Sequence, residues 1–434
     1  MARGSTLLFA LLLHQCRAFV LQRHRNPAVL QESSGNDDRS WQEALQRRQR
    51  ELTAAVREPW RSADCETRVA CVLPNWVRRV AVDYPFIACG SASGTIYVGN
   101  LELQPGGIQE EPETGLVAVT PDLVDGDEHP RIAEATRLLF GSYDGGGTLA
   151  VAMSDSLIVD SRRDGGLHLW RFADKEILRQ GKLLDDELVL SVTIHNDLLW
   201  VGTLTGGLNA YALDDDTRPL SLRSPIAEWS LDAAVISISV CDDLDVAVVA
   251  TASGSVQLLS TDIDENDEDR RPLGSFYPPW DSVERRSTNS YALSAVVVPH
   301  ADNESYSVVC GGTDGSVYVQ PLNVETLETR PFTERLRNLK PRHLAAVPCL
   351  ASPAPGMVVT GGRDGRLRMW ELAKELQDDN IQDDSCLYQF VGYKVWLGSM
   401  WTDGKRLVTD GSDNTVLMHM VRNLESETSG PVEE

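Results

Sequence analysis

Residues able to carry catalysis occur in this sequence, but not at the spacings that catalytic and metal sites require. No two of the eight histidines are four residues apart, the spacing that puts two imidazoles on one helix face as metal ligands. The HExxH, GxSxG and GxxxxGK[ST] motifs are absent. The pattern predicts a non-catalytic protein with no metal or cofactor site.

The charge of the chain restricts the partners that it can bind. There are 64 acidic residues against 40 lysines and arginines, for a formal net charge of −24. A nucleic acid or an anionic membrane requires a basic surface, so neither is expected as a partner. The acidic runs are interpreted as solvated loops and lie at 110–113, 214–216, 262–269, 378–384 and 425–434. Two alternatives stay open: a calcium site at 262–269 (DIDENDED) and attraction for a basic protein partner.

The cysteines indicate the cellular compartment of the protein rather than a metal-binding role. None of the eight forms a CxxC pair or a zinc-binding spacing. Cys89 and Cys310 lie in apolar stretches, where cysteine acts as a small core residue. A disulfide framework is not indicated, which favours a reducing compartment over the secretory lumen.

The first 39 residues have the character of targeting signals. Residues 6–13 (TLLFALLL) are too short to span a bilayer but suit the core of a signal peptide, which we assign to residues 1–18. Residues 19–39 begin with Phe19 and a basic stretch, FVLQRHRNPAVLQ. This arrangement resembles the bipartite plastid-targeting presequences of algae with secondary plastids, which implies import into a plastid. Plain secretion is the alternative, and no later segment approaches the length of a membrane span.

A helix is expected at residues 40–58. Ser40 and Glu43 form a capping box, and Pro59 is expected to stop the helix. Apolar residues recur at spacings of three, four and seven, so one face should lie against the folded body rather than serve as a free partner-binding helix.

The body of the chain, residues 66–422, contains seven copies of one unit, followed by an acidic tail at 423–434 that is expected to be disordered. Each copy has an apolar strand, a short turn, a second strand, a tight turn and a third strand. The tight turns are marked by Gly94, Gly165, Gly206, Gly254, Gly315, Gly365 and Asn414. The shortest separation of these markers is 41 residues and the longest is 71. A period just above forty is typical of propeller blades.

Five residues after their markers stand Trp170 and Trp370, in LHLW and LRMW. This is where WD40 repeats keep their tryptophan, so the chain resembles a seven-bladed WD40-type propeller over residues 67–421. The resemblance implies an all-β fold of four-stranded antiparallel blades. The sequence departs from the family pattern because the Gly-His pair is missing and because other residues replace the tryptophan: Gly99, Tyr211, Leu259, Gln320 and His419.

Closure of the ring can be predicted as well. The chain ends one strand after its last tight turn, which leaves the seventh blade without an outer strand. The extended segment 66–73 (ETRVACVL) has no other place and is expected to complete that blade, so that no strand edge stays open.

The resemblance also points to candidate binding residues. In propellers the first turns of the innermost strands surround the central channel. The aromatic, arginine and histidine side chains expected there are candidate protein-interaction residues: Trp76, Arg78, Tyr291, His343 and Trp396. For any one of them, packing between neighbouring blades is an equal alternative.

These observations predict a non-catalytic scaffold that holds a protein complex together, in assembly or maintenance of a plastid complex. One alternative is an enzyme with its site in the central funnel, built around His343 and acids of neighbouring blades. Another is a substrate receptor of a ubiquitin ligase, but the adaptor-binding module that it needs before the ring is not apparent. The partner and the oligomeric state do not follow from the sequence.

The targeting interpretation can be tested with a fluorescent fusion. Residues 1–39 fused to a fluorescent protein should direct it to the plastid, whereas the same fusion carrying Phe19→Ala should be retained outside. Fluorescence microscopy of the two fusions in an alga with a secondary plastid measures the difference. Identical distributions would contradict the interpretation.

Overall fold

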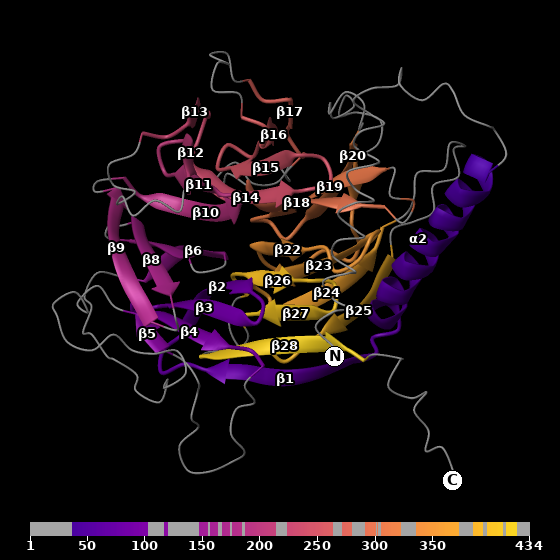
Figure 1. Ribbon diagram of the computed structural model, residues 1–434, viewed down its shortest axis with the longest axis horizontal. Coiled ribbons are helices and arrows are strands. Elements are labelled where there is room, and N and C mark those ends of the chain that lie inside the picture. The colour runs from indigo at the N-terminus through magenta and orange to yellow at the C-terminus, as the bar shows by residue number, and fades with distance from the viewer. Residues whose placement is uncertain are drawn as a thin grey trace, which may run out of the picture.

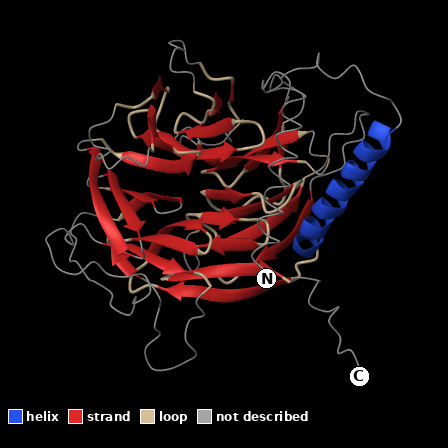
Figure 2. Cartoon of the chain, in the orientation of Figure 1, coloured by secondary structure: helices blue, strands red, loops and turns tan. Residues whose placement is uncertain are grey.

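The computed structural model shows seven four-stranded antiparallel sheets arranged as the blades of a ring, with one helix beside them (Figure 1, Figure 2). It describes residues 37–102, 117–119, 147–154, 157–163, 167–173, 176–184, 187–213, 224–263, 271–279, 291–300, 302, 305–322, 336–372, 385–393, 397–410 and 414–422. In six sheets the strands follow chain order from the inner to the outer edge. The predicted all-β, seven-bladed fold is confirmed.

The first four blades use the strands between residues 77 and 276. Blade 1 consists of β2 (Val77–Asp83), β3 (Phe86–Ser91), β4 (Ile96–Asn100) and β5 (Val117–Val119). Blade 2 consists of β6 (Thr148–Ser154), β7 (Leu157–Arg162), β8 (Leu167–Ala173) and β9 (Glu176–Leu184). Blade 3 consists of β10 (Val189–His195), β11 (Leu198–Thr203), β12 (Gly207–Ala212) and β13 (Ala227–Ser230). Blade 4 consists of β14 (Val235–Cys241), β15 (Val246–Thr251), β16 (Val256–Ser260) and β17 (Gly274–Phe276).

The last three blades complete the ring. Blade 5 consists of β18 (Ala292–Pro299), β19 (Tyr306–Gly312), β20 (Val317–Leu322) and β21 (Arg337–Asn338). Blade 6 consists of β22 (Cys349–Ala351), β23 (Met357–Gly362), β24 (Arg366–Glu371) and β25 (Ser385–Phe390). Blade 7 consists of β26 (Met400–Thr402), β27 (Arg406–Thr409), β28 (Thr415–Val421) and, from the other end of the described chain, β1 (Cys65–Val72). The inner strand of each blade contacts the inner strand of the next, all the way around the ring.

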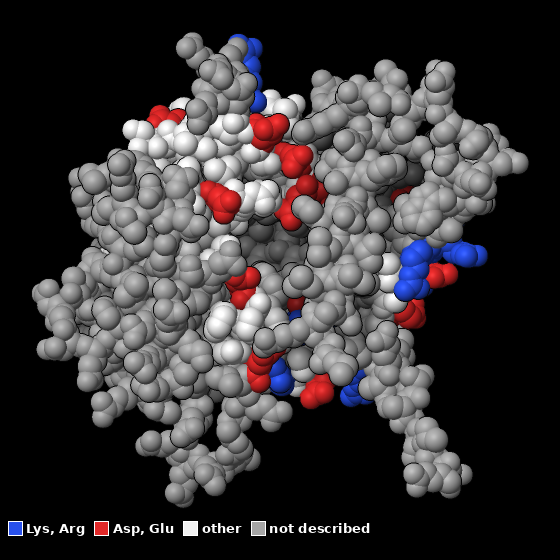
Figure 3. All heavy atoms as spheres, in the orientation of Figure 1, with Lys and Arg blue, Asp and Glu red and all other residues white. Residues whose placement is uncertain are grey.

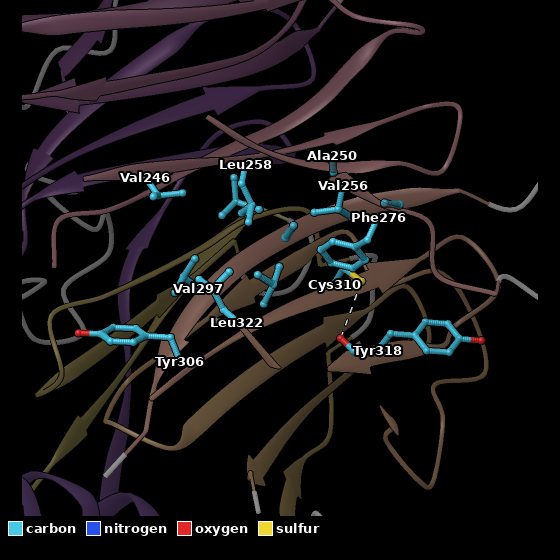
Figure 4. Close-up of a cluster of buried hydrophobic side chains, with 14 residues drawn as sticks. Val246, Ala250, Val256, Leu258, Phe276, Val297, Tyr306, Cys310, Tyr318 and Leu322 are labelled. Carbon is cyan, nitrogen blue, oxygen red and sulfur yellow. Dashed lines mark hydrogen bonds between the residues drawn. The ribbon is translucent and has the colours of Figure 1, made fainter. Parts of the chain in front are cut away.

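The core of the protein lies in the seams between neighbouring blades. Successive side chains of a strand point to opposite faces of its sheet, so each blade packs against both of its neighbours. In β15, Val246 and Val248 belong to the seam with blade 5, whereas Ala247 and Val249 belong to the seam with blade 3. Figure 4 shows the seam between blades 4 and 5, where the apolar side chains of both sheets meet. Because both faces are covered, second strands of the blades such as β7, β15, β19 and β23 are buried along their whole length.

The cysteines belong to these seams. Cys89 and Cys310 are fully buried, as expected from their apolar surroundings. The seven cysteines of the described chain are free, and burial raises the pKa of thiols such as Cys310 and Cys349. A raised pKa disfavours the reactive thiolate, so these residues act as packing groups.

The ring is closed by β1, as predicted for residues 66–73. This strand pairs antiparallel with β28 from Cys65 opposite Val421 to Val72 opposite Thr415. At its end the Leu73 N–H donates to the Asn414 carbonyl at 2.7 Å, and the Asn414 side-chain amide donates to the Leu73 carbonyl at 2.6 Å. The first and last strands of the ring thus share one sheet.

Helix α2 (Asp37–Arg61) is longer than the predicted helix at 40–58. Ser40 is not at its start, and Pro59 lies inside its last turn rather than ending it. The proline removes one backbone donor, a loss of a few kcal/mol at most, while the next residue, Trp60, is fully buried against blades 6 and 7. That burial holds the last turn in place. No helix in the described part of the chain combines the length and apolar character needed to cross a membrane.

The C-terminal part of α2 packs on the propeller (Figure 1). Arg57 forms an ion pair with Glu371 of blade 6 at 2.8 Å. The Trp60 indole donates to the Gly404 carbonyl of blade 7 at 2.7 Å. Tyr388 of β25 donates its hydroxyl to the Trp60 carbonyl. The helix therefore bridges blades 6 and 7, next to the strand that closes the ring.

Trp60→Ala should destabilise the protein by about 3–5 kcal/mol, because it leaves a large cavity and removes the indole hydrogen bond. Urea denaturation followed by circular dichroism measures this loss. Trp76→Ala is the matched control, since Trp76 is exposed, and should change the free energy of unfolding by less than about 1 kcal/mol. Equal effects of the two substitutions would contradict the anchoring role of Trp60.

Candidate functional site

One face of the ring carries the connections that lead into the inner strands, together with the turns between the second and third strands. We call it the mouth face, because it surrounds one opening of the central channel. In blades 1, 3, 4, 5 and 6 a recurring backbone hydrogen bond ties this turn to the connection that leads into the same blade. The donor and acceptor pairs are Ala92 and Trp76, Leu204 and Leu188, Ala252 and Ala234, Thr313 and Tyr291, and Arg363 and Ala346.

Exposed apolar side chains concentrate on the mouth face. The described chain has six large hydrophobic residues with exposed side chains, and five of them belong to this face: Trp76, Leu204, Tyr277, Leu344 and Val391. Leu344 is 78% exposed and Trp76 is 56% exposed. The sixth, Val69, lies on β1 at the outer edge of blade 7. They are distributed over several blades, and Tyr277 and Val391 directly follow the outer strands of blades 4 and 6.

Three of the predicted binding residues lie at this mouth. Trp76 directly precedes β2 and is exposed, while Arg78 lies near the start of β2 and is partly buried. Tyr291 directly precedes β18 and is partly buried, with its backbone N–H donating to the Thr313 hydroxyl at 3.0 Å. Trp396 lies outside the described residues. Position before an inner strand therefore identified Trp76 as a surface aromatic, but it did not distinguish exposed from buried side chains.

His343 also precedes an inner strand, but its side chain is buried in the protein interior and is 1% exposed. Its Nδ1 lies 3.0 Å from an Asp364 carboxylate oxygen, and its Nε2 lies 2.7 Å from the Thr360 hydroxyl. The Trp370 indole donates to that same hydroxyl at 2.9 Å. An indole can only donate, so the Thr360 hydroxyl accepts from Trp370, and the two ring nitrogens of His343 are occupied by Thr360 and Asp364. The ring of His343 is thus committed to packing and is not displayed to a partner or a substrate.

This chain of hydrogen bonds ties the connection before blade 6 to the turn of that blade. Burial alone would raise the pKa of Asp364, but the hydrogen bonds from His343 and from the Leu344 N–H hold it below its usual value. Gly362 leaves the necessary room, because a Cβ at this position would lie 2.3 Å from Nδ1 of His343. The Asp364-Gly365 turn, with Thr360 before it and Trp370 after it, was the available sequence signal for this role.

Blade 2 fills the corresponding positions with charged groups. Asp160 takes the place of Thr360 and accepts from the Trp170 indole. Arg162 takes the place of Gly362, and its Nε donates to Asp160 at 2.7 Å. Both side chains are fully buried. Burial acts to raise the pKa of Asp160, yet Arg162 and then His168 bring it below its usual value.

Blade 7 has a third solution. His419, which replaces the family tryptophan, lies 2.8 Å through Nε2 from the Tyr393 hydroxyl and 2.7 Å through Nδ1 from the Thr67 hydroxyl. Tyr393 comes from the connection before blade 7, and Thr67 comes from β1. Burial lowers the pKa of His419 to about 4, so the ring is neutral at physiological pH. Its two hydrogen bonds join the closing strand to the last blade.

Known proteins were compared with this chain at the level of fold and of sequence. No family model matches it. The crystal structure of the WD40 β-propeller domain of Doa1 has a TM-score of 0.50 at 14% identity, covering 82% of this chain and 98% of that domain. The chain is a seven-bladed β-propeller whose fold is similar to that of this WD40 domain. At this identity the likeness concerns the fold alone.

Sequence similarity to curated proteins is confined to parts of the propeller. Mitochondrial division protein 1 of Eremothecium gossypii is 32% identical over 75 residues, which is 17% of this chain and 10% of that protein. Protein ROOT INITIATION DEFECTIVE 3 of Arabidopsis thaliana is 26% identical over 171 residues, or 39% of this chain and 36% of that protein. THO complex subunit 6 of Homo sapiens is 29% identical over 150 residues, or 33% and 38%. The propeller therefore spans between about a tenth and two fifths of the relatives it matches.

The buried His419 predicts how stability depends on pH. Its pKa is about 4 in the folded chain against 6.5 for a free histidine, so the unfolded chain takes up the proton first as the pH falls. This group should stabilise the fold above pH 6.5 and lose about 3 kcal/mol of that contribution by pH 4. Urea denaturation of wild type and His419→Gln across this range isolates the effect. The difference in unfolding free energy between them should shrink toward pH 4, and parallel curves would contradict the assignment.

Proposed function

We propose that this protein is a non-catalytic scaffold that binds protein partners through its mouth face. The observation that carries the proposal is the concentration of exposed apolar residues on that face of a strongly acidic body. Exposed aromatic and large aliphatic residues gathered on one surface mark interaction sites, whereas isolated ones do not. Because these five residues belong to several blades, the partner should contact more than one blade of the mouth face.

The architecture supports this role. Seven apolar seams and a closed ring give a stiff platform, so binding costs little ordering of the scaffold itself. Around the central hollow of the face in Figure 3, acidic side chains predominate over basic ones. A net charge of −24 keeps the ring soluble and suppresses unspecific association, so that contact depends on local complementarity.

The cellular role that we propose is assembly or maintenance of a plastid complex. The basic presequence with Phe19 supports the location. The human relative with partial similarity is named as a subunit of a complex, and the fungal relative is named as a division protein of another organelle. Both names are compatible with a propeller that works by holding other proteins.

An enzymatic role has less support. The alternative was built on His343, whose ring is occupied by Asp364 and Thr360. In the part of the chain that the structure describes, no group of three potential metal ligands occurs. The scaffold is therefore the function that the arrangement favours.

Affinity capture with face-specific variants tests the proposal. The wild-type protein should retain stable protein partners from a plastid extract, and Trp76→Ala/Leu344→Asp should lose them at least about tenfold, because both exposed apolar contacts are removed. Quantitative mass spectrometry measures the recovery. Val69→Asp is the matched control, since it alters an exposed apolar residue away from the mouth face, and it should leave recovery unchanged.

Two results would overturn the proposal. A wild-type protein that recovers no partner would exclude the scaffold role under these conditions. Partners lost by Val69→Asp and kept by the double variant would assign binding to the outer edge of blade 7.

A further inference from the structure

A local positive site lies at the mouth of this acidic protein. Arg78 and Arg79 lie near the start of β2, and Arg163 follows β7 in the adjacent blade. The Nε of Arg78 comes within 3.0 Å of where a Cβ on Gly147 would lie. Gly147 directly precedes Thr148, which pairs with Arg162. The side chain of Arg78 therefore reaches across the seam toward the turn that presents Arg163.

Arg79 has a structural role below this pair. Its Nε donates to the Leu149 carbonyl of blade 2 and its Nη1 to the Arg78 carbonyl, both at 2.7 Å. A buried carboxylate, Asp410 of blade 7, faces it across Gly398, because a Cβ on that glycine would lie within 3 Å of both side chains. The Gly398 and Ser399 N–H groups donate to Asp410 at 2.7 and 3.1 Å. Burial lowers the pKa of Arg79, and the nearby Asp410 carboxyl group opposes that shift.

No described acidic group acts on Arg78 in the way that Asp410 acts on Arg79. Among the described residues no carboxylate forms an ion pair with either guanidinium, and the exposed Arg163 stands next to the partly buried Arg78. Burial first, and then the like charge of Arg163, lowers the pKa of Arg78. An anion between the two guanidinium groups would remove this repulsion and supply the missing acceptors.

Trp76 stands beside the pair. Its carbonyl accepts from the Ala92 N–H at 2.8 Å, and the Ala92 carbonyl is the nearest group to a Cβ built on Gly147. The connection that carries the exposed Trp76 and the side chain of Arg78 therefore both lie at the seam between blades 1 and 2. Tryptophan and arginine are the residue types that contribute most to binding at protein interfaces.

We propose that Arg78 and Arg163 bind a carboxylate of an acidic segment in the protein partner, while Trp76 packs against the residues that flank it. This inference rests on the proposed function and specifies the partner's chemistry at blades 1 and 2. A guanidinium fork fits a carboxylate in a bidentate manner. A nucleic acid is a poorer fit, because a long polyanion would extend beyond this site onto a body of net charge −24. A short acidic segment needs compensation only within about one Debye length, roughly 10 Å.

A labelled peptide probe tests the inference directly. Fluorescein-labelled deca-glutamate should bind the full chain at low salt, as measured by fluorescence anisotropy, and deca-glutamine should not. Arg78→Glu/Arg163→Glu should weaken binding of deca-glutamate by about tenfold or more, since two attractive charges become repulsive. Arg163→Glu alone changes an exposed residue, so it should weaken binding several-fold without any effect on folding.

The matched control is Arg48→Glu/Arg422→Glu, which makes the same change in net charge at two exposed arginines of α2 and the chain end of blade 7. It should leave the affinity for deca-glutamate within about twofold of wild type. Equal loss in both double variants would overturn the site, because net charge alone would then explain binding. Equal binding of deca-glutamine would overturn the acidic specificity.

The outcome is separable from the proposed function. If Trp76→Ala/Leu344→Asp abolishes partner capture while deca-glutamate fails to bind, the scaffold role stands and the acidic-segment inference falls. If deca-glutamate binding depends on Arg78 and Arg163 while capture does not depend on the apolar residues, the arginine site stands and the proposed mouth-face scaffold falls.

Discussion

The pairing of β1 with β28 is the constraint on which the rest of the structure depends. Each blade has two apolar faces, so a single sheet has no stable surface toward water and needs a neighbour on both sides. Seven blades satisfy this need only if the last meets the first. The strand from residues 65–72 supplies the outer edge of blade 7, and Cys71 and Leu73 enter the seam with blade 1. Without this strand both a sheet edge and part of a seam would face solvent.

The polar chains at the blade turns explain how repeats with different residues keep one geometry. Blade 6 connects its turn through His343, Thr360 and Trp370, whereas blade 2 uses a buried ion pair of Asp160 and Arg162 at the corresponding positions. What the fold requires there is a satisfied set of buried donors and acceptors, not one residue type. In blade 7 these hydrogen-bonded groups include Thr67 of β1, so the hydrogen bonds that stabilise the blade also hold the strand that closes the ring.

Much of this fold was accessible from the sequence, because period, turn glycines and apolar runs are local properties. Gly94, Gly206, Gly254, Gly315 and Gly365 all have positive φ, as a tight turn between antiparallel strands requires. Apart from the closing strand β1, the outer strands could not be predicted from the sequence. β5 has three residues inside a polar insert, and β21 has two, so their pairing depends on the neighbouring strand rather than on their own pattern. For the candidate site, position in the repeat predicted that Trp76 and Arg78 lie at the start of an inner strand, but the burial of His343 depends on partners 17 and 21 residues away.

Two distance ranges determine what the mouth face can bind: long-range electrostatics of the whole ring and direct contacts within a few ångströms. The net negative charge, set by 64 acidic residues, repels other polyanions from the whole ring at long range. Contact chemistry is set within a few ångströms, where Trp76 offers apolar area and Arg78 and Arg163 offer donors that the described chain leaves uncompensated. The hydrogen bonds of Arg79 fix the start of β2, so the backbone that carries Arg78 keeps its position before a partner arrives. A backbone that is already ordered loses little entropy on binding, which favours a small site on a surface whose overall charge opposes the ligand.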